Sequence, residues 1–293
     1  MICSACPRMC FSQRDDYSNL KGFCLSPYLP FIARASLHKW EEPCVSGTNG
    51  SGTVFFSGCT LRCVFCQNET ISRKPYGKQF DKNGFIELIK KLEDSGAHNI
   101  NLVNPTHYIP FIAEALSSYK PSVPVVFNSG GYERTESLRT LEGLIDVYLP
   151  DLKYVDPGIS KKYSGVDNYF EFASKAVLEM HRQVGLPEFD GNGLIRKGLI
   201  IRHLVIPGNI ADSFRVIDFV ADNLPKETCM SLMSQYTPMS KNEKMPELNR
   251  RLTTFEYEKV ISHFKDRGLE NAYIQQINSA KKQYIPDFSD FGI

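Results

Sequence analysis

From residue 53 onward, short apolar segments alternate with longer segments that have the periodicity of amphipathic helices. In residues 83–96, for example, Phe85, Ile89 and Leu92 recur at helical spacing. Strands that alternate with helices along a chain form a parallel sheet covered by helices. Because at least six such units follow one another, the sequence predicts an α/β fold with an open or closed barrel.

The expected elements are spread over most of the chain. The expected strands lie at residues 53–57, 99–103, 123–128, 145–154, 198–209, 229–236 and 272–277. The expected helices lie at residues 83–96, 110–119, 133–144, 170–183, 210–223 and 255–267. Residues 1–50 differ, because they show little periodicity and carry five of the nine cysteines.

Three cysteines follow the first expected strand, with the spacing Cys-x3-Cys-x2-Cys at Cys59, Cys63 and Cys66. Ligands of parallel α/β folds lie at the carboxyl ends of strands, which is where this loop falls. Three thiolates can bind an iron–sulfur cube and leave one iron open for a substrate or cofactor. A zinc knuckle completed by a distant ligand, or plain buried cysteines, remain alternatives on spacing alone.

The segment "GCTLRCVFCQN", with Phe65 beside the third cysteine, resembles the radical S-adenosylmethionine (SAM) enzymes, and the resemblance runs from about residue 52 to 236. More narrowly, the chain is similar to the pyruvate formate-lyase activating enzyme and its homologues of the PflX type. The latter also carry an N-terminal CxxCPRxC segment. This resemblance implies a partial (β/α)6 barrel of the TIM-like, radical SAM type.

The resemblance also implies the cofactors and the chemistry. Cys59, Cys63 and Cys66 would bind a 4Fe–4S cluster, and SAM would chelate the fourth iron. The reduced cluster would pass one electron to the sulfonium of SAM. The resulting 5′-deoxyadenosyl radical would then remove a hydrogen atom from the substrate, with reduced flavodoxin or ferredoxin as the electron donor.

Residues at the other strand ends are expected near SAM by the same resemblance. Where the family has Gly-Gly-Glu-Pro, this chain has "NPTH", so Asn104 or Thr106 would accept a hydrogen bond from the SAM amino group. Lys153 of the family's Asp-Leu-Lys and Arg202, which precedes Val-Ile-Pro-Gly, are expected to be catalytic. An arginine fork suits a carboxylate. The expected SAM-binding residues are Phe65, Asn104, Thr106, Asn128, Ser129, Asp151, Lys153, Arg202 and Gln235.

A second group of cysteines lies near the N-terminus, at Cys3, Cys6, Cys10 and Cys24. Four thiolates can close a metal site, but only one Cys-x2-Cys knuckle is present, whereas zinc sites usually combine two. The spacing therefore favours an auxiliary 4Fe–4S cluster over zinc, which remains the alternative. We divide the chain into a Cys-rich metal-binding extension, residues 1–50, and a core barrel with C-terminal elements, residues 51–293.

Four other polar or thiol residues carry structural expectations. The adjacent Glu41 and Glu42 are expected to be a solvated pair, and a position facing the active site is the alternative. His203 is expected on the opposite face of its strand from Arg202, packed against a helix. Cys229 is expected in the core.

The composition excludes several classes of partner. The net charge is +1, which gives no field for nucleic acid or an acidic membrane surface. No apolar run is long enough to cross a bilayer. The first residues, "MICSACPRMC", lack the pattern of a secretory signal, so we expect a cytoplasmic protein.

The leading prediction is a radical SAM enzyme that acts on a protein, by similarity to the activation of glycyl-radical enzymes. A radical modification of another protein or of a small molecule is one alternative. The other is a non-catalytic iron–sulfur protein that transfers electrons.

Overall fold

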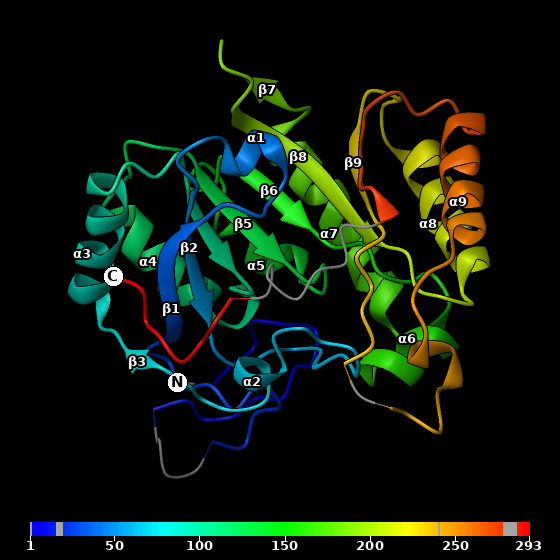
Figure 1. The fold of residues 1–293 in the computed structure, drawn as a ribbon. Coiled ribbons are helices and arrows are strands. Elements are labelled where there is room, and N and C mark those ends of the chain that lie inside the picture. The colour runs from blue at the N-terminus through cyan, green and yellow to red at the C-terminus, as the bar shows by residue number, and fades with distance from the viewer. Residues whose placement is uncertain (1, 16–19, 240, 278–285) are drawn as a thin grey trace.

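The computed structural model describes residues 2–15, 20–239, 241–277 and 286–293. The strands are β1 (Phe31–His38), β2 (Ser51–Phe56), β3 (Lys78–Gln79), β4 (Ile100–Val103), β5 (Val125–Ser129), β6 (Val147–Pro150), β7 (Glu188–Phe189), β8 (Ile195–Leu204), β9 (Cys229–Met233) and β10 (Ala272–Ile274). They form one sheet in the order β10-β9-β8-β6-β5-β4-β2-β1-β3, with β7 paired to β8 (Figure 1).

From β2 to β10, neighbouring strands on this path are parallel, whereas β1 runs antiparallel to β2. In the described part of the chain, β3 and β10 are the two edges and do not pair with each other. The sheet is therefore curved but not closed, and the predicted partial barrel is confirmed.

Helices cover the outer face of the sheet (Figure 1). The longer ones are α3 (Lys82–Asp94), α4 (Ile109–Ser118), α7 (Tyr169–Val184), α8 (Ile210–Asn223) and α9 (Thr254–Asp266). Shorter ones are α1 (Pro43–Ser46), α2 (Glu69–Ser72), α5 (Thr135–Arg139), α6 (Pro157–Ser164) and the 3-10 turns η2 (Thr106–Tyr108) and η3 (Pro246–Asn249). Within the described residues, no helix is both long and apolar enough to cross a membrane.

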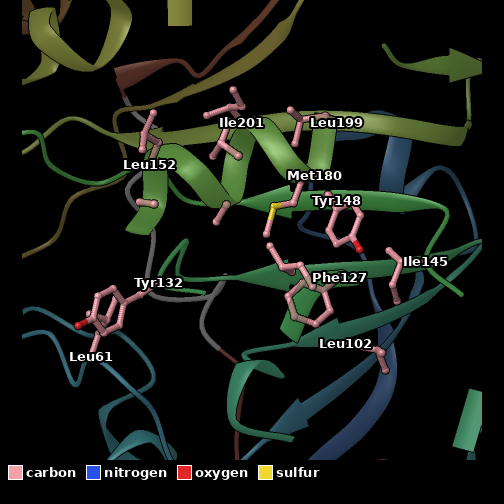
Figure 2. Close-up of a cluster of buried hydrophobic side chains, with 14 of the residues drawn as sticks. Leu61, Leu102, Phe127, Tyr132, Ile145, Tyr148, Leu152, Met180, Leu199 and Ile201 are labelled. Atoms are coloured by element: carbon pink, nitrogen blue, oxygen red, sulfur yellow. The ribbon is translucent and has the colours of Figure 1, made fainter. Parts of the chain in front are cut away.

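Alternation along β5, β6, β8 and β9 separates two apolar clusters. Figure 2 shows the larger one, in which Phe127, Tyr148 and Ile201 pack with Met180 of α7. The smaller one lies on the inner face, where Val45 of α1 meets side chains of the opposite parity. Because successive side chains of a strand point to opposite faces, both clusters follow from the strand pattern. The inner cluster contains Cys44, Val45, Val126, Val147, Leu149, Ile195, Ile200 and Cys229.

Several elements differ from the sequence predictions, among them the following two. The predicted helix at 133–144 is wrong at both ends, because α5 covers only Thr135–Arg139 and is followed by turns that include Gly143 at φ +78°. Residues 1–50 contain a strand that was not predicted, β1, which pairs with β2 along its length. The proposed boundary near residue 50 remains a prediction.

Gly131, in the turn after β5, is held where only glycine fits. Its φ is +76°, and a Cβ atom there would lie 1.9 Å from the carbonyl oxygen of Asp151. Gly143 has a similar φ of +78° but nothing within 4 Å of the position of a Cβ. Substitutions at the two glycines therefore distinguish the cost of backbone strain from the cost of a close contact.

We expect Gly131→Ala to lower the free energy of unfolding by about 3 kcal/mol, since it adds a steric clash to the left-handed strain. Gly143→Ala should cost about 1 kcal/mol, because only the strain applies. Urea denaturation followed by circular dichroism measures both. Equal losses would show that the approach to Asp151 is not what constrains this turn.

Candidate functional site

The loop after β2 brings its three cysteines to one cavity. Cys59, Cys63 and Cys66 all line a cavity of about 220 Å³ at the carboxyl ends of the strands. The backbone N–H groups of Leu61 and Arg62 point at Cys59 Sγ, at 3.4 and 3.5 Å. The predicted meeting of these cysteines at one site is therefore seen in the structure.

The chemistry of the three thiols fits a polynuclear metal centre. Burial, with smaller contributions from the neighbouring Cys59 and Cys63, raises the pKa of Cys66 to about 12. Burial likewise raises the pKa of Cys59. Metal ligation requires thiolates, so a positively charged centre would supply the stabilisation that these thiols lack without it. No three His, Cys, Asp or Glu side chains of the described residues are grouped to hold a single ion.

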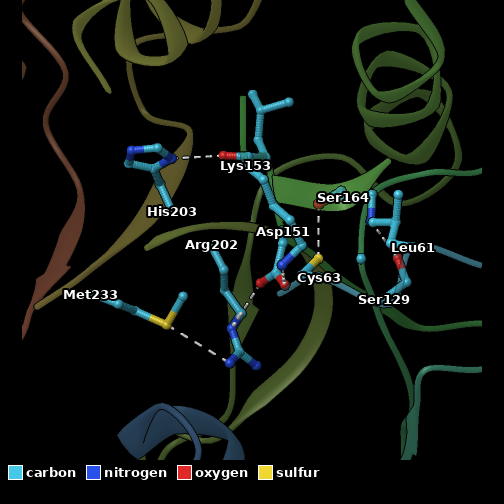
Figure 3. A network of polar contacts seen from close by, with 12 residues as sticks. Leu61, Cys63, Ser129, Asp151, Lys153, Ser164, Arg202, His203 and Met233 are labelled. Carbon is cyan, nitrogen blue, oxygen red and sulfur yellow. Dashed lines mark hydrogen bonds and ion pairs between the residues drawn. The ribbon is translucent and has the colours of Figure 1, made fainter. Parts of the chain in front are cut away.

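A charged network forms the wall opposite the cysteines. Figure 3 shows Asp151 between Lys153 and Arg202. The Lys153 ammonium donates to Asp151 Oδ2, and Arg202 Nε lies 3.6 Å from Asp151 Oδ1. Alternation along a strand places Asp151 and Lys153 on one face, and their side chains contact each other there. Burial lowers the pKa of Lys153, but Asp151 and the cysteines outweigh it, and the pKa is raised to about 12.

Two carboxylates that were expected in solvent belong to this network. The prediction for Glu41 and Glu42 is wrong: Glu42 is 8% exposed, and Glu41 accepts a hydrogen bond from Arg202 Nη1 at 3.1 Å. The reason is α1, which packs Val45 into the inner cluster and so draws the preceding residues inward. Burial raises the pKa of Glu41, and Arg202 opposes that rise.

Most of the other predicted residues line the same cavity. Asn128 lies beside Glu41, with Nδ2 at 3.4 Å from Oε1. Asn104 has a φ of +59° and donates its side-chain amide to the carbonyl of Gly58. Phe65 packs edge-on against Tyr236 at 6.1 Å between ring centroids. The predicted residues that line the cavity are Asn104, Asn128, Ser129, Asp151, Lys153, Arg202 and Gln235.

Thr106 is not brought to the cavity. It is 1% exposed, and its hydroxyl donates to Glu133 Oε1 at 2.6 Å. Burial raises the pKa of Glu133 to about 7, and its Oε2 has no hydrogen-bond partner among the described residues. Thr106 therefore contacts a buried carboxyl group rather than the cysteine-lined cavity.

His203 and Cys229 have the structural roles that were predicted. His203 Nε2 lies 2.9 Å from the hydroxyl of Ser213 on α8, and Figure 3 shows it pointing away from Arg202. Burial lowers the pKa of His203 to about 4, so the ring is neutral at pH 7. Cys229 is 5% exposed within the inner apolar cluster.

The N-terminal cysteines lie together, outside the cavity. Cys3, Cys6 and Cys24 are buried and Cys10 is exposed. Burial raises the pKa of Cys6 to about 12, with further contributions from the other three thiols. Arg8 donates to the carbonyl of Thr60 at 2.8 Å, which ties this segment to the Cys59 loop.

Between β1 and α1, sequence reasoning singled out only the acidic pair, with a solvated position as the main expectation and the active site as the alternative. Trp40 and Glu41 line the cavity, as does His38 at the end of β1. Their segment has no periodicity and no familiar motif. Its only signal is a pair of adjacent acids before a proline, which is also common on surfaces.

We expect Arg202→Met to lower the free energy of unfolding by about 3–5 kcal/mol, because it leaves buried carboxylates without their cation. Arg196 on the same strand is exposed, so Arg196→Met should stay within about 0.5 kcal/mol of the parent. Urea denaturation at pH 7 compares them. Equal losses in the two variants would show that the charged network around Arg202 does not contribute to the free energy of unfolding.

Comparisons with known proteins bear on the family of this chain. The family model of the radical SAM superfamily matches residues 53–214, which include all three loop cysteines and Arg202. The uncharacterised protein MJ0674 of Methanocaldococcus jannaschii is 30% identical over 92% of this chain and 76% of its own length. MJ0808 of the same organism is 24% identical over 80% of this chain and 67% of its own length.

Solved structures with similar folds are more distant. A domain of the pyruvate-formate lyase-activating enzyme from Bacteroides vulgatus is 16% identical, with a TM-score of 0.40 over 59% of this chain and 91% of that one. SuiB of Streptococcus suis, bound to S-adenosylmethionine, is 14% identical, with a TM-score of 0.46 over 77% and 47%. The family match covers more than half of the chain, and the chain belongs to the radical SAM superfamily.

Proposed function

We propose that this protein reductively cleaves SAM at a 4Fe–4S cluster and uses the resulting 5′-deoxyadenosyl radical to remove a hydrogen atom from a substrate. The main support is that Cys59, Cys63 and Cys66 line the same cavity as the charged network of Asp151, Lys153 and Arg202. Superfamily membership implies the cluster and SAM. In this proposal the three cysteines bind the cluster and leave its fourth iron to SAM.

The side chains around the cavity would bind and orient SAM. Arg202 and Lys153 supply positive charge for its carboxylate, and Arg202 Nε has no hydrogen-bond partner among the described residues. Asn104, Asn128, Ser129, Asp151 and Gln235 supply polar groups around the same space. Phe65 is proposed to lie near the adenine. Thr106 is left out, because its hydroxyl is occupied by Glu133.

For the substrate, we propose a protein in which a backbone glycine loses a hydrogen atom, as in the activation of glycyl-radical enzymes. The support is the similarity of residues 151–153 and of the segment at Arg202 to the activating enzymes. Reduced flavodoxin or ferredoxin would supply the electron. The absence of Gly-Gly-Glu-Pro sets this chain apart from those enzymes.

We also propose that Cys3, Cys6, Cys10 and Cys24 bind a second metal centre, a 4Fe–4S cluster in preference to zinc. Burial raises the pKa of Cys6 and of Cys24, and neighbouring thiols of the group add to the rise. A bound metal centre would stabilise the thiolate forms of these cysteines. Arg8 connects this group to the cysteine loop through Thr60. An iron–sulfur centre there would lie beside the proposed active site.

The protein, reconstituted anaerobically with iron and sulfide and given dithionite and SAM, should form 5′-deoxyadenosine. Chromatography with mass detection measures it. A variant with Cys59, Cys63 and Cys66 replaced by alanine should form none, because it has lost the cluster ligands. Product from that variant, or none from the parent with an intact cluster and SAM bound, would overturn the proposal.

The choice of substrate is tested separately, by adding a glycyl-radical enzyme to the active mixture. A glycyl signal in the electron paramagnetic resonance spectrum supports a protein substrate of this class. If 5′-deoxyadenosine forms without that signal, the proposal of SAM cleavage stands and the tested enzyme is excluded as the substrate.

Replacing Cys3, Cys6, Cys10 and Cys24 together by alanine should lower the iron content of the reconstituted protein by about four atoms per chain. Cys229→Ala is the matched control, because that buried cysteine belongs to the inner apolar cluster. Iron and zinc are measured by atomic emission. Loss of one zinc instead of iron would identify a zinc site, and no loss of either metal would contradict the proposal.

A further inference from the structure

A second cavity adjoins the one lined by cysteines. It has a volume of about 230 Å³ and shares Trp40, Glu41, Arg202 and Gln235 with the first. Its far wall comes from β9 and β10, with Met233 and Tyr273 among the lining residues. We call this space the side chamber. Its volume is close to the 220 Å³ of the cysteine-lined cavity.

The charges around the side chamber do not balance among the described residues. Asp151 has Lys153 as its partner, and Arg202 forms its shortest carboxylate contact with Glu41, at 3.1 Å. Glu42 is left with a contact of 3.7 Å between its Oε1 and Arg202 Nε. Three carboxylates thus share two cations, and the excess of negative charge lies at Glu42.

Glu42 is also the residue with an unused hydrogen-bond acceptor. Its side chain is 7% exposed, and its Oε2 has no hydrogen-bond partner within the part of the chain that the structure describes. Burying an unpaired carboxylate is costly unless a proton or a cation neutralises it. Glu42 lines the side chamber but not the cysteine-lined cavity. A cation bound at Glu42 would therefore be distinct from SAM at the cysteines.

Aromatic rings complete a cation site. Trp40 and Tyr273 line the chamber along with Glu42. The face of an aromatic ring attracts ammonium and guanidinium groups, and tryptophan does so most strongly. Acceptor oxygens and aromatic faces together favour a nitrogen cation over a neutral or anionic group.

We propose that the side chamber binds an ammonium or guanidinium group of the substrate and so holds that substrate beside SAM. This inference rests on the proposed function, because it assigns a substrate class to the same site. The cation has two possible sources, a small-molecule amine or the basic side chain of a protein substrate. Both present the same chemistry to Glu42.

The test is calorimetric titration of the reconstituted, SAM-loaded protein with two matched pairs of probes. One pair is 5-aminopentanol and its neutral analogue 1,5-pentanediol. The other is a blocked Gly-Lys-Gly peptide and the same peptide with its lysine acetylated. We expect at least one charged probe to bind about tenfold or more tightly than its neutral analogue, a difference of about 1.4 kcal/mol. The pair with the larger difference in affinity between its charged and neutral members identifies the source of the cation.

Variants assign the binding to Glu42. Glu42→Gln should weaken binding of the charged probe by about tenfold. Glu42→Asp, which keeps the charge, should weaken that binding less. Glu258→Gln, at an exposed position on α9, should leave the affinity unchanged. Circular dichroism and iron content check that each variant is folded. Trp40 is the single tryptophan of the chain, so its fluorescence gives a second readout at the chamber.

Three results would overturn the inference: equal affinity for charged and neutral probes, no effect of Glu42→Gln, or displacement of SAM by the charged probe. The last would mean that the carboxylates serve SAM itself. The same samples are assayed for 5′-deoxyadenosine. SAM cleavage without a preference for the charged probe would refute only the proposal that the side chamber binds a cation. Cation binding without SAM cleavage would refute only the proposed function.

Discussion

Arg202 is the cation around which the interior of the sheet is organised. It lies on β8, and it contacts Asp151 after β6 and Glu41 between β1 and α1. A guanidinium group can serve several carboxylates at once, because its five donors point in fixed directions. These contacts join three parts of the chain that are distant in sequence. They also hold charged groups in the interior of the sheet, next to the end that is filled with apolar side chains.

The interior is therefore layered. Val45 of α1 and its neighbours fill one end with apolar side chains. The carboxylates and Arg202 form the next layer, and the cysteine loop lies beyond them at the carboxyl ends of the strands. The apolar layer excludes water from the base of the site, which strengthens the electrostatic contacts above it. The charged layer in turn connects the cysteine-lined cavity to the side chamber, so both spaces depend on the same arginine.

The N-terminal extension supports the cysteine loop from the outside. Arg8 donates to the carbonyls of Thr60 and Ser164, and Arg14 donates to the carbonyl of His107. The carbonyl of Thr60 belongs to the loop that carries Cys59, so the extension holds this loop directly. The extension thus contributes to the shape of the site even though its own cysteines lie outside the cavity.

The sequence by itself determined the alternating strands and helices, the cysteine loop after the first of the parallel strands, and the shared face of Asp151 and Lys153. These features depend on residue type and on periods of 2 and 3.6, which are local properties of a chain. The tertiary structure decided that Glu41 meets Arg202, because their contact spans 161 positions and depends on how α1 packs. It also turned Thr106 toward Glu133 through the η2 turn. Such outcomes are set by which distant surfaces fit together, and no local pattern encodes that.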